Sequence, residues 1–131
     1  MTRHDAREQA FIIIFEKSFH NETDINELIS FAEENEVFKA DAYSVSLCKN
    51  TVENIEKLDS YIISNLKGWS YNRVSKVAKA ILRLALSEML FSEDVPVSVA
   101  INEAVELAKK YAGDDEPAFI NGILGSIAKE L

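Results

Sequence analysis

Apolar residues recur at spacings of three and four along almost the whole chain, whereas strict alternation of apolar and polar residues is brief and scattered. Spacings of three and four place side chains on one face of an α-helix. Only two prolines and four glycines interrupt the pattern. The sequence therefore predicts an all-α fold, a compact bundle of about seven helices.

Turn and capping signals divide this pattern into separate helices. Asp24 followed by Glu27 is typical of a helix start, and Lys67-Gly68 is typical of a helix end. Asp94-Val95-Pro96 predicts another start, because proline fits the first turn, where its missing N–H costs nothing. The predicted helices cover approximately residues 3–19, 24–34, 40–66, 70–91 (two helices or one bent helix), 96–111 and a last segment after a loop at 112–117.

The composition is that of a globular protein, and residues 1–131 are interpreted as a single domain because no linker, repeat or low-complexity tract divides them. With 47% apolar residues the chain can bury a core without a disulfide or metal. Cys48 is the only cysteine, which agrees with a reducing compartment. The first residues do not resemble a signal peptide, and apolar runs are far shorter than the ~20 residues that span a bilayer. We therefore expect a soluble, cytoplasmic protein.

Charge is distributed unevenly along the chain. The net charge of -8 argues against a protein that coats nucleic acids non-specifically. Residues 67–87, called here the basic stretch, nevertheless contain five basic residues and no acidic one: Lys67, Arg73, Lys76, Lys79 and Arg83. Spacings of three and four place at least three of these cations on one helical face. A clean basic stretch in an acidic protein predicts local contact with a polyanion.

Two aromatic residues, Trp69 and Tyr71, lie at the start of the basic stretch. Rings beside cations are typical of single-stranded RNA sites, where rings stack on bases and cations bind phosphates. The alternative is a solvated helix face next to two core aromatics, and spacing alone does not decide between the two interpretations.

A second group of cations, called here the N-terminal cluster, consists of Arg3, His4 and Arg7 in the first predicted helix. Cations are not favoured at a helix start, because the helix dipole favours negative charge there. Their placement suggests a binding role, although Asp5 and Glu8 could pair with them as ordinary surface salt bridges.

The sequence offers little for catalysis. His4 and His20 are the only histidines and lack zinc-binding spacing. The four glycines form neither a phosphate-binding loop nor a dinucleotide fingerprint. Cys48 lies on an apolar helix face, which favours a buried hydrophobic role over that of a nucleophile. We therefore expect no catalytic residue, cofactor or metal, and no enzyme.

Four ordered motifs point to a known family. They read AILRLALSE from Ala80, DVP from Asp94, VAINEAVELAK from Val99 and FINGIL from Phe119. Together with the opening Ala6-Arg7-Glu8, they resemble the signature of the NusB family, and the resemblance covers the whole chain. It implies a fold of about seven helices and a transcription antitermination factor that binds the boxA element of ribosomal RNA leader transcripts. The implied partners are the small-subunit ribosomal protein NusE and the RNA polymerase antitermination complex.

The resemblance also implies roles for individual residues. Arg3 and Arg7 would hold RNA phosphates, and Lys79 would lie near both the RNA and the ribosomal protein. Asp115 and Phe119 would lie where the RNA passes, with Phe119 able to stack on a base. The candidate RNA-binding residues are therefore Arg3, His4, Arg7, Arg73, Lys76, Lys79, Asp115 and Phe119.

The N-terminal cluster departs from the arginine-rich start of some family members, because Asp5 interrupts it and it contains few cations. Each lost cation removes part of the counterion release that drives RNA binding. We expect the isolated protein to bind RNA weakly and tight binding to require the partner. We also expect Arg7→Ala to weaken RNA binding with little loss of thermal stability.

Other motif residues are expected to be structural. Internal ion pairs between helices are expected for Arg83, Glu88 and Glu103. Asn102 and Asn121 are expected to satisfy buried helix ends, and Gly122 to allow close helix packing.

Two other interpretations remain open. Ribosomal RNA cytosine-5 methyltransferases carry a NusB-like accessory domain ahead of a catalytic domain, which is absent from a chain that stops at Leu131. A homodimer whose RNA face is covered is the other interpretation.

Overall fold

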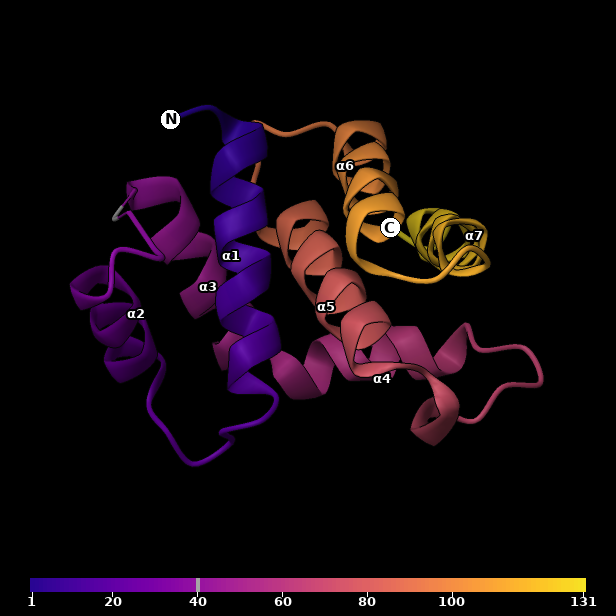
Figure 1. The fold of residues 1–131 in the computed structure, drawn as a ribbon. Coiled ribbons are helices and arrows are strands. Elements are labelled where there is room, and N and C mark those ends of the chain that lie inside the picture. The colour runs from indigo at the N-terminus through magenta and orange to yellow at the C-terminus, as the bar shows by residue number, and fades with distance from the viewer. Residues whose placement is uncertain (40) are drawn as a thin grey trace.

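The computed structural model describes residues 1–39 and 41–131, and every regular element in this part of the chain is helical (Figure 1). The described residues form seven α-helices and one 3₁₀ turn: α1 (Arg3–Lys17), α2 (Ile25–Glu34), α3 (Ala42–Glu53), α4 (Ile55–Ser64), η1 (Tyr71–Arg73), α5 (Lys76–Phe91), α6 (Val97–Tyr111) and α7 (Glu116–Ala128). The predicted all-α bundle of about seven helices is confirmed for the described residues.

Several helices begin where the sequence places a capping residue. The Asp24 side chain accepts a hydrogen bond from the Asn26 N–H and caps α2, as predicted. Pro96 directly precedes α6, also as predicted. Thr2 and Ser75 cap α1 and α5 in the same way, with side-chain oxygens that accept from backbone N–H groups. The capping signals thus locate these helix starts closely.

The single long helix predicted over 40–66 is wrong, because the chain forms α3 and α4 with a break at Asn54. The Asn54 backbone leaves helical geometry (φ −117°, ψ 19°), and its side-chain amide donates to the Asn50 carbonyl at 2.8 Å. Asparagine competes in this way for the hydrogen bonds that continue a helix. The predicted start at Ala40 lies outside the described residues.

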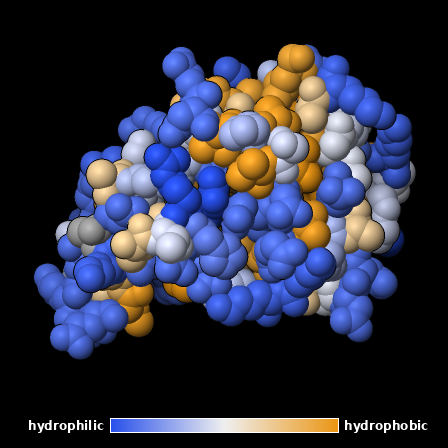
Figure 2. Space-filling model, turned by 90° about the horizontal axis from the view of Figure 1, so that it is seen from above, coloured by the Kyte–Doolittle hydropathy of each residue, from blue (hydrophilic) through white to orange (hydrophobic). Residues whose placement is uncertain are grey.

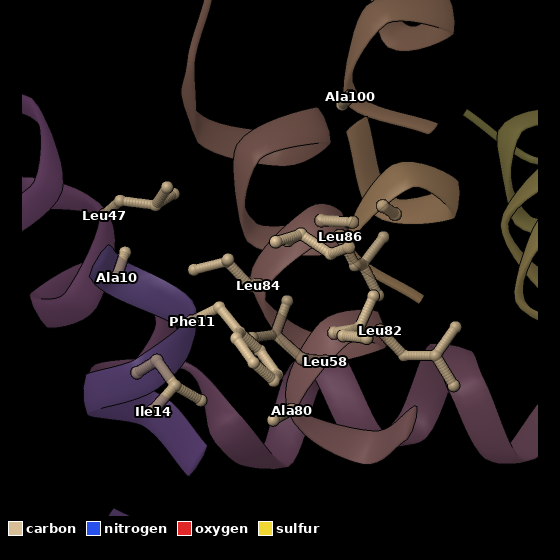
Figure 3. Close-up of a cluster of buried hydrophobic side chains, with 14 of the residues drawn as sticks. Ala10, Phe11, Ile14, Leu47, Leu58, Ala80, Leu82, Leu84, Leu86 and Ala100 are labelled. Carbon is tan, nitrogen blue, oxygen red and sulfur yellow. The ribbon is translucent and has the colours of Figure 1, made fainter. Parts of the chain in front are cut away.

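The core is built around α5, which contacts α1, α3, α4, α6 and α7. Figure 3 shows Phe11 and Ile14 of α1, Leu47 of α3 and Leu58 of α4 around Leu82, Leu84 and Leu86 of α5. Ten residues of α5 are buried, all of them from Ala78 onward. A helix that is apolar around most of its circumference belongs in a core. Its first turn, by contrast, reaches the surface.

Cys48 lies inside this core, as predicted, and burial raises the pKa of its thiol to about 12. Such a thiol stays protonated and unreactive at neutral pH. The described helices include none long and apolar enough to cross a membrane. Residues 1–39 and 41–131 also bring together no group of three side chains suited to hold a metal ion.

Candidate nucleic-acid interface

The basic stretch spans the loop after α4, the turn η1 and most of α5. In Figure 1 this loop projects at the right, and α2 lies at the left. Gly68 allows the chain to turn after α4, because its φ of +78° lies in the left-handed region. The Ser75 hydroxyl caps α5 and also donates to Glu116 Oε1 of α7 at 2.7 Å. This hydrogen bond connects the basic stretch to the start of α7.

Connection to α7 brings together residues that are distant in sequence. The ring of Trp69 lies 5.7 Å from the ring of Phe119, centroid to centroid, at an interplanar angle of 56°. Trp69 is 56% exposed, while Phe119 is half-buried. Asp115 is exposed at the N-cap position of α7, one turn before Phe119. The structure therefore places Phe119 and Asp115 beside the basic stretch.

Three basic side chains of this surface carry unneutralised charge. In the described part of the chain, Arg73, Lys76 and Lys79 form no salt bridge with an acidic residue. The Lys76 ammonium lies 4.6 Å from the centroid of the Phe19 ring and donates to the Ser18 carbonyl at 3.3 Å. Such cation–π contacts position a lysine without removing its charge.

Tyr71 and Arg83 belong to an internal cluster instead of this open surface. Arg83 binds Asp59 of α4 through two parallel hydrogen bonds of 2.8 Å, and the Tyr71 hydroxyl donates to the same carboxylate at 2.7 Å. Burial, assisted by the Asp59 hydrogen bond, raises the pKa of Tyr71 above its usual value. The Lys79 ammonium lies 4.4 Å from the centroid of the Tyr71 ring. The Arg83 ion pair expected from sequence is confirmed. The Tyr71 ring of this cluster positions the Lys79 ammonium.

The N-terminal cluster has the opposite character, because acids of the same chain engage each of its cations. Arg3 Nη2 lies 3.2 Å from Asp94 Oδ2. His4 Nδ1 lies 2.8 Å from Glu103 Oε2, and this hydrogen bond is the main cause that raises the His4 pKa. Figure 2 looks onto this end of the molecule, where polar side chains surround an apolar band.

Arg7 lies inside the protein, with only 6% of its surface exposed. Its Nε donates to both carboxylate oxygens of Glu88 in α5, at 2.9 and 2.8 Å, and Glu88 also accepts from the Tyr43 hydroxyl of α3. Arg7 Nη1 lies 3.8 Å from Glu103 of α6. The internal ion pairs expected for Glu88 and Glu103 are confirmed. Because Arg7 is buried and paired, it is not available for the RNA phosphate contact that the resemblance implies. Its ion pairs instead connect α1 to α5 and α6.

The two cation groups lie at opposite ends of α1. The N-terminal cluster occupies its first two turns, while Lys76 contacts Ser18 directly after its last residue. Because α1 has 15 residues and a helix rises about 1.5 Å per residue, the ends are about 22 Å apart. The candidate residues therefore divide into two separate surfaces. The roles of Asp59 and Asp94 could not be predicted, because both acids are far from their partners along the chain, and for Glu103 an internal ion pair was expected but not its partners His4 and Arg7.

Comparison with known proteins identifies the family. The NusB family model matches residues 4–129. A transcription antitermination protein NusB of Exiguobacterium sp. is 39% identical over 130 residues, which cover 99% of each chain. A protein of the same name from Clostridium perfringens is 42% identical over 134 residues, covering 100% of this chain and 99% of the relative. The chain belongs to the NusB family.

Solved NusB structures share the fold. T. maritima NusB superposes with a TM-score of 0.86 at 33% identity, covering 99% of this chain and 92% of that one. A crystal structure of the antitermination factors NusB and NusE in complex with double-stranded RNA gives a TM-score of 0.85 at 30% identity and full coverage of both chains. Membership of the NusB family places the chain among non-enzymatic transcription factors, as the sequence predicts.

Three residues of the NusB motifs do not have the structural roles expected of them. Asn102 and Asn121 are exposed on α6 and α7, so neither satisfies a buried helix end. A Cβ atom added at Gly122 would meet nothing within 4 Å, so close packing does not require glycine there. These expectations were wrong because the spacing of a motif does not tell which face of its helix is covered.

Proposed function

We propose that this chain is an antitermination factor that binds boxA-type single-stranded RNA in leader transcripts of ribosomal RNA operons. It does so in the cytoplasm together with the ribosomal protein NusE, and the assembly joins RNA polymerase. Membership of the NusB family supports this proposal, as does the similarity to a NusB–NusE–RNA complex.

One observation carries the proposal: the basic stretch presents unpaired cations near the exposed ring of Trp69 and the half-buried ring of Phe119. Arg73, Lys76 and Lys79 lack acidic partners among the described residues. Arg73 lines the same hollow as Trp69, whose ring lies beside that of Phe119. Cations that bind phosphates release counterions, and rings stack on unpaired bases. A duplex hides its bases from such rings, so the surface favours a single strand over a double strand.

The pairing of the N-terminal cluster supports the expectation that tight RNA binding requires the partner. Its cations are engaged by Asp94, Glu88 and Glu103, so an RNA phosphate would have to displace a carboxylate from Arg3 or His4. The RNA affinity of the isolated chain then depends on the few free cations of the basic stretch. Each phosphate contact with a single strand contributes about −0.7 to the salt slope of log K, so four cations including Lys67 give about −3. NusE would add contacts that this chain lacks.

The test is fluorescence anisotropy of a labelled boxA-type single-stranded RNA titrated with the protein, with and without NusE, at two salt concentrations. We expect selective binding over a scrambled strand and over a duplex of the same sequence, with tighter binding when NusE is present. No binding of the boxA-type strand in either condition would contradict the proposal.

A matched pair of double variants locates the surface. Lys76→Gln with Lys79→Gln removes two free cations, and we expect an affinity loss of about 25-fold at 0.1 M salt. Lys109→Gln with Lys110→Gln removes the same charge from α6, where the two lysines pair with Glu106 and Glu8. The second variant controls for net charge. Equal losses in both variants would show that overall charge, and not the basic stretch, determines the affinity.

A further inference from the structure

Trp69 is a large aromatic side chain that the fold leaves open to solvent. It lies on the loop between α4 and η1 and is 56% exposed. The loop turns at Gly68, and the Ser75–Glu116 hydrogen bond anchors the chain after η1 to α7. Burial of an indole favours folding, so an exposed indole on this loop contributes little to stability. A surface role accounts better for its position.

The two aromatic residues of this segment differ in what they can bind. Tyr71 is occupied, because its hydroxyl donates to Asp59 and the Lys79 ammonium lies on its ring. Among the described aromatic rings, only that of Phe119 lies beside Trp69, in a tilted arrangement. Of the two rings that the sequence offers for stacking, the structure therefore leaves Trp69 accessible.

A cavity of about 430 Å³ opens beside Trp69 and is lined by Gly68, Trp69, Ser70 and Arg73. The lining residues bring an indole, a serine hydroxyl and the Arg73 guanidinium, which forms no salt bridge with an acid of the described chain. These are the groups that hold a nucleotide of a single strand: a ring for the base, a hydroxyl for its edge and a cation for its phosphate.

We infer that the cavity beside Trp69 binds one unpaired nucleobase, which stacks on the indole while Arg73 contacts the adjoining phosphate. This site rests on the proposed RNA binding and adds to it a stacking residue that the family resemblance did not imply. Phe119, 5.7 Å away, stacks on a neighbouring base of the same strand. Trp69 and Phe119 thereby bind consecutive unpaired bases, and the strand follows the loop toward Lys79.

Trp69 is the only tryptophan of the chain, so its fluorescence reports on this cavity alone. The experiment titrates the full chain with a boxA-type single-stranded RNA and follows two signals, tryptophan emission and the anisotropy of an end-labelled strand. We expect quenching that saturates at the same RNA concentration as the anisotropy. Anisotropy that rises while tryptophan emission stays unchanged overturns the nucleobase site and leaves the proposed function intact. Absence of both signals overturns the site together with the proposed function.

Variants at Trp69 separate stacking from charge. Trp69→Ala removes the ring, and we expect RNA affinity to fall by about 5- to 150-fold, the range for loss of one stacked base. Trp69→Phe keeps a ring, and we expect it to retain most of the affinity. Phe31→Ala removes an aromatic side chain that is 65% exposed on α2, and it serves as the matched control. Trp69 is exposed, so we expect Trp69→Ala to keep its core intact and to fold. Equal RNA affinities for Trp69→Ala and the unaltered protein therefore overturn the site.

An abasic RNA series gives an independent readout. One nucleotide at a time is replaced by an abasic one, which keeps the phosphate and removes the base. We expect one position at which the replacement weakens binding to the unaltered protein but has no further effect on Trp69→Ala. Additive losses at every position overturn the assignment of a base to this cavity.

Discussion

The cations of the N-terminal cluster are paired with acids after folding, whereas the cations at residues 73–79 of the basic stretch are not paired with any acid of the described chain. Arg3, His4 and Arg7 each meet a carboxylate of the same chain. Arg73, Lys76 and Lys79 do not within the described residues, and two of these cations lie on tyrosine or phenylalanine rings instead. The difference teaches that a count of cations does not measure affinity for a polyanion. What matters is whether the charge remains unpaired after folding.

The largest expected effect is on the free energy of unfolding, when the buried ion pair between Arg7 and Glu88 is broken. Arg7→Met leaves Glu88, which is 2% exposed, without its charged partner, and the free energy of unfolding should fall by about 3–5 kcal/mol. This replaces the earlier expectation of little stability loss for Arg7→Ala. Urea denaturation followed by circular dichroism measures the change. Arg73→Met is the control, with an exposed arginine, and should change stability by less than about 0.5 kcal/mol.

Breaking the half-buried ion pair between Arg83 and Asp59 should lower the free energy of unfolding by an intermediate amount. Arg83→Met removes two hydrogen bonds to Asp59 but leaves the one from the Tyr71 hydroxyl, so we expect a loss of about 1–3 kcal/mol. The same urea titrations measure it. A loss as small as that of Arg73→Met would show that the pair is too solvated to hold α4 on α5.

For RNA affinity, unlike stability, a substitution in the basic stretch should have a larger effect than one in the N-terminal cluster. Lys79→Gln removes a cation that is free to contact phosphate, and we expect about a fivefold loss at 0.1 M salt. Arg3→Gln removes a cation that already pairs with Asp94, so the loss should be smaller. Anisotropy titrations of both variants with the same RNA decide the matter. A larger loss for Arg3→Gln would place the RNA on the N-terminal cluster.

The smallest effect concerns pH. The hydrogen bond to Glu103 raises the His4 pKa in the folded protein above its ordinary value of 6.5. The pair should therefore stabilise the fold fully below about pH 6.5, and this contribution should disappear as pH rises through the raised pKa. Because His4 is exposed, we expect under about 0.5 kcal/mol. Melting curves at pH 6 and pH 9 should show His4→Gln less stable than the unaltered protein only at pH 6.

The helices were predictable where local chemistry determines them. Asp24 and Pro96 mark real helix starts, because capping depends on neighbouring residues. The break at Asn54 was missed, because the apolar stripe continues through it and Cys48, Leu58 and Ile62 are all buried. Hydrophobic spacing detects which residues face the core but not a change of axis between two helices.

The candidate site was only partly predictable for a related reason. The sequence identified the cations and rings, and their spacing placed several on one helical face. It did not reveal that Glu88, 81 residues away, would bury Arg7, or that Asp59 would engage both Arg83 and Tyr71. The approach of Trp69 to Phe119 likewise depends on the packing of α7.

The first turn of α5 reaches the surface, and the rest of the helix packs in the core. Lys76 and Lys79 lie in its first turn and contact no acid of the described chain, while the segment from Ala80 to Met89 is almost entirely enclosed. Substitutions at positions 76 and 79 can therefore retune ligand preference without altering the packed interior. Substitutions beyond residue 80 act mainly on folding. A library randomised at positions 76 and 79 alone would test how far the proposed RNA affinity can be changed while buried residues such as Ala78 stay in place.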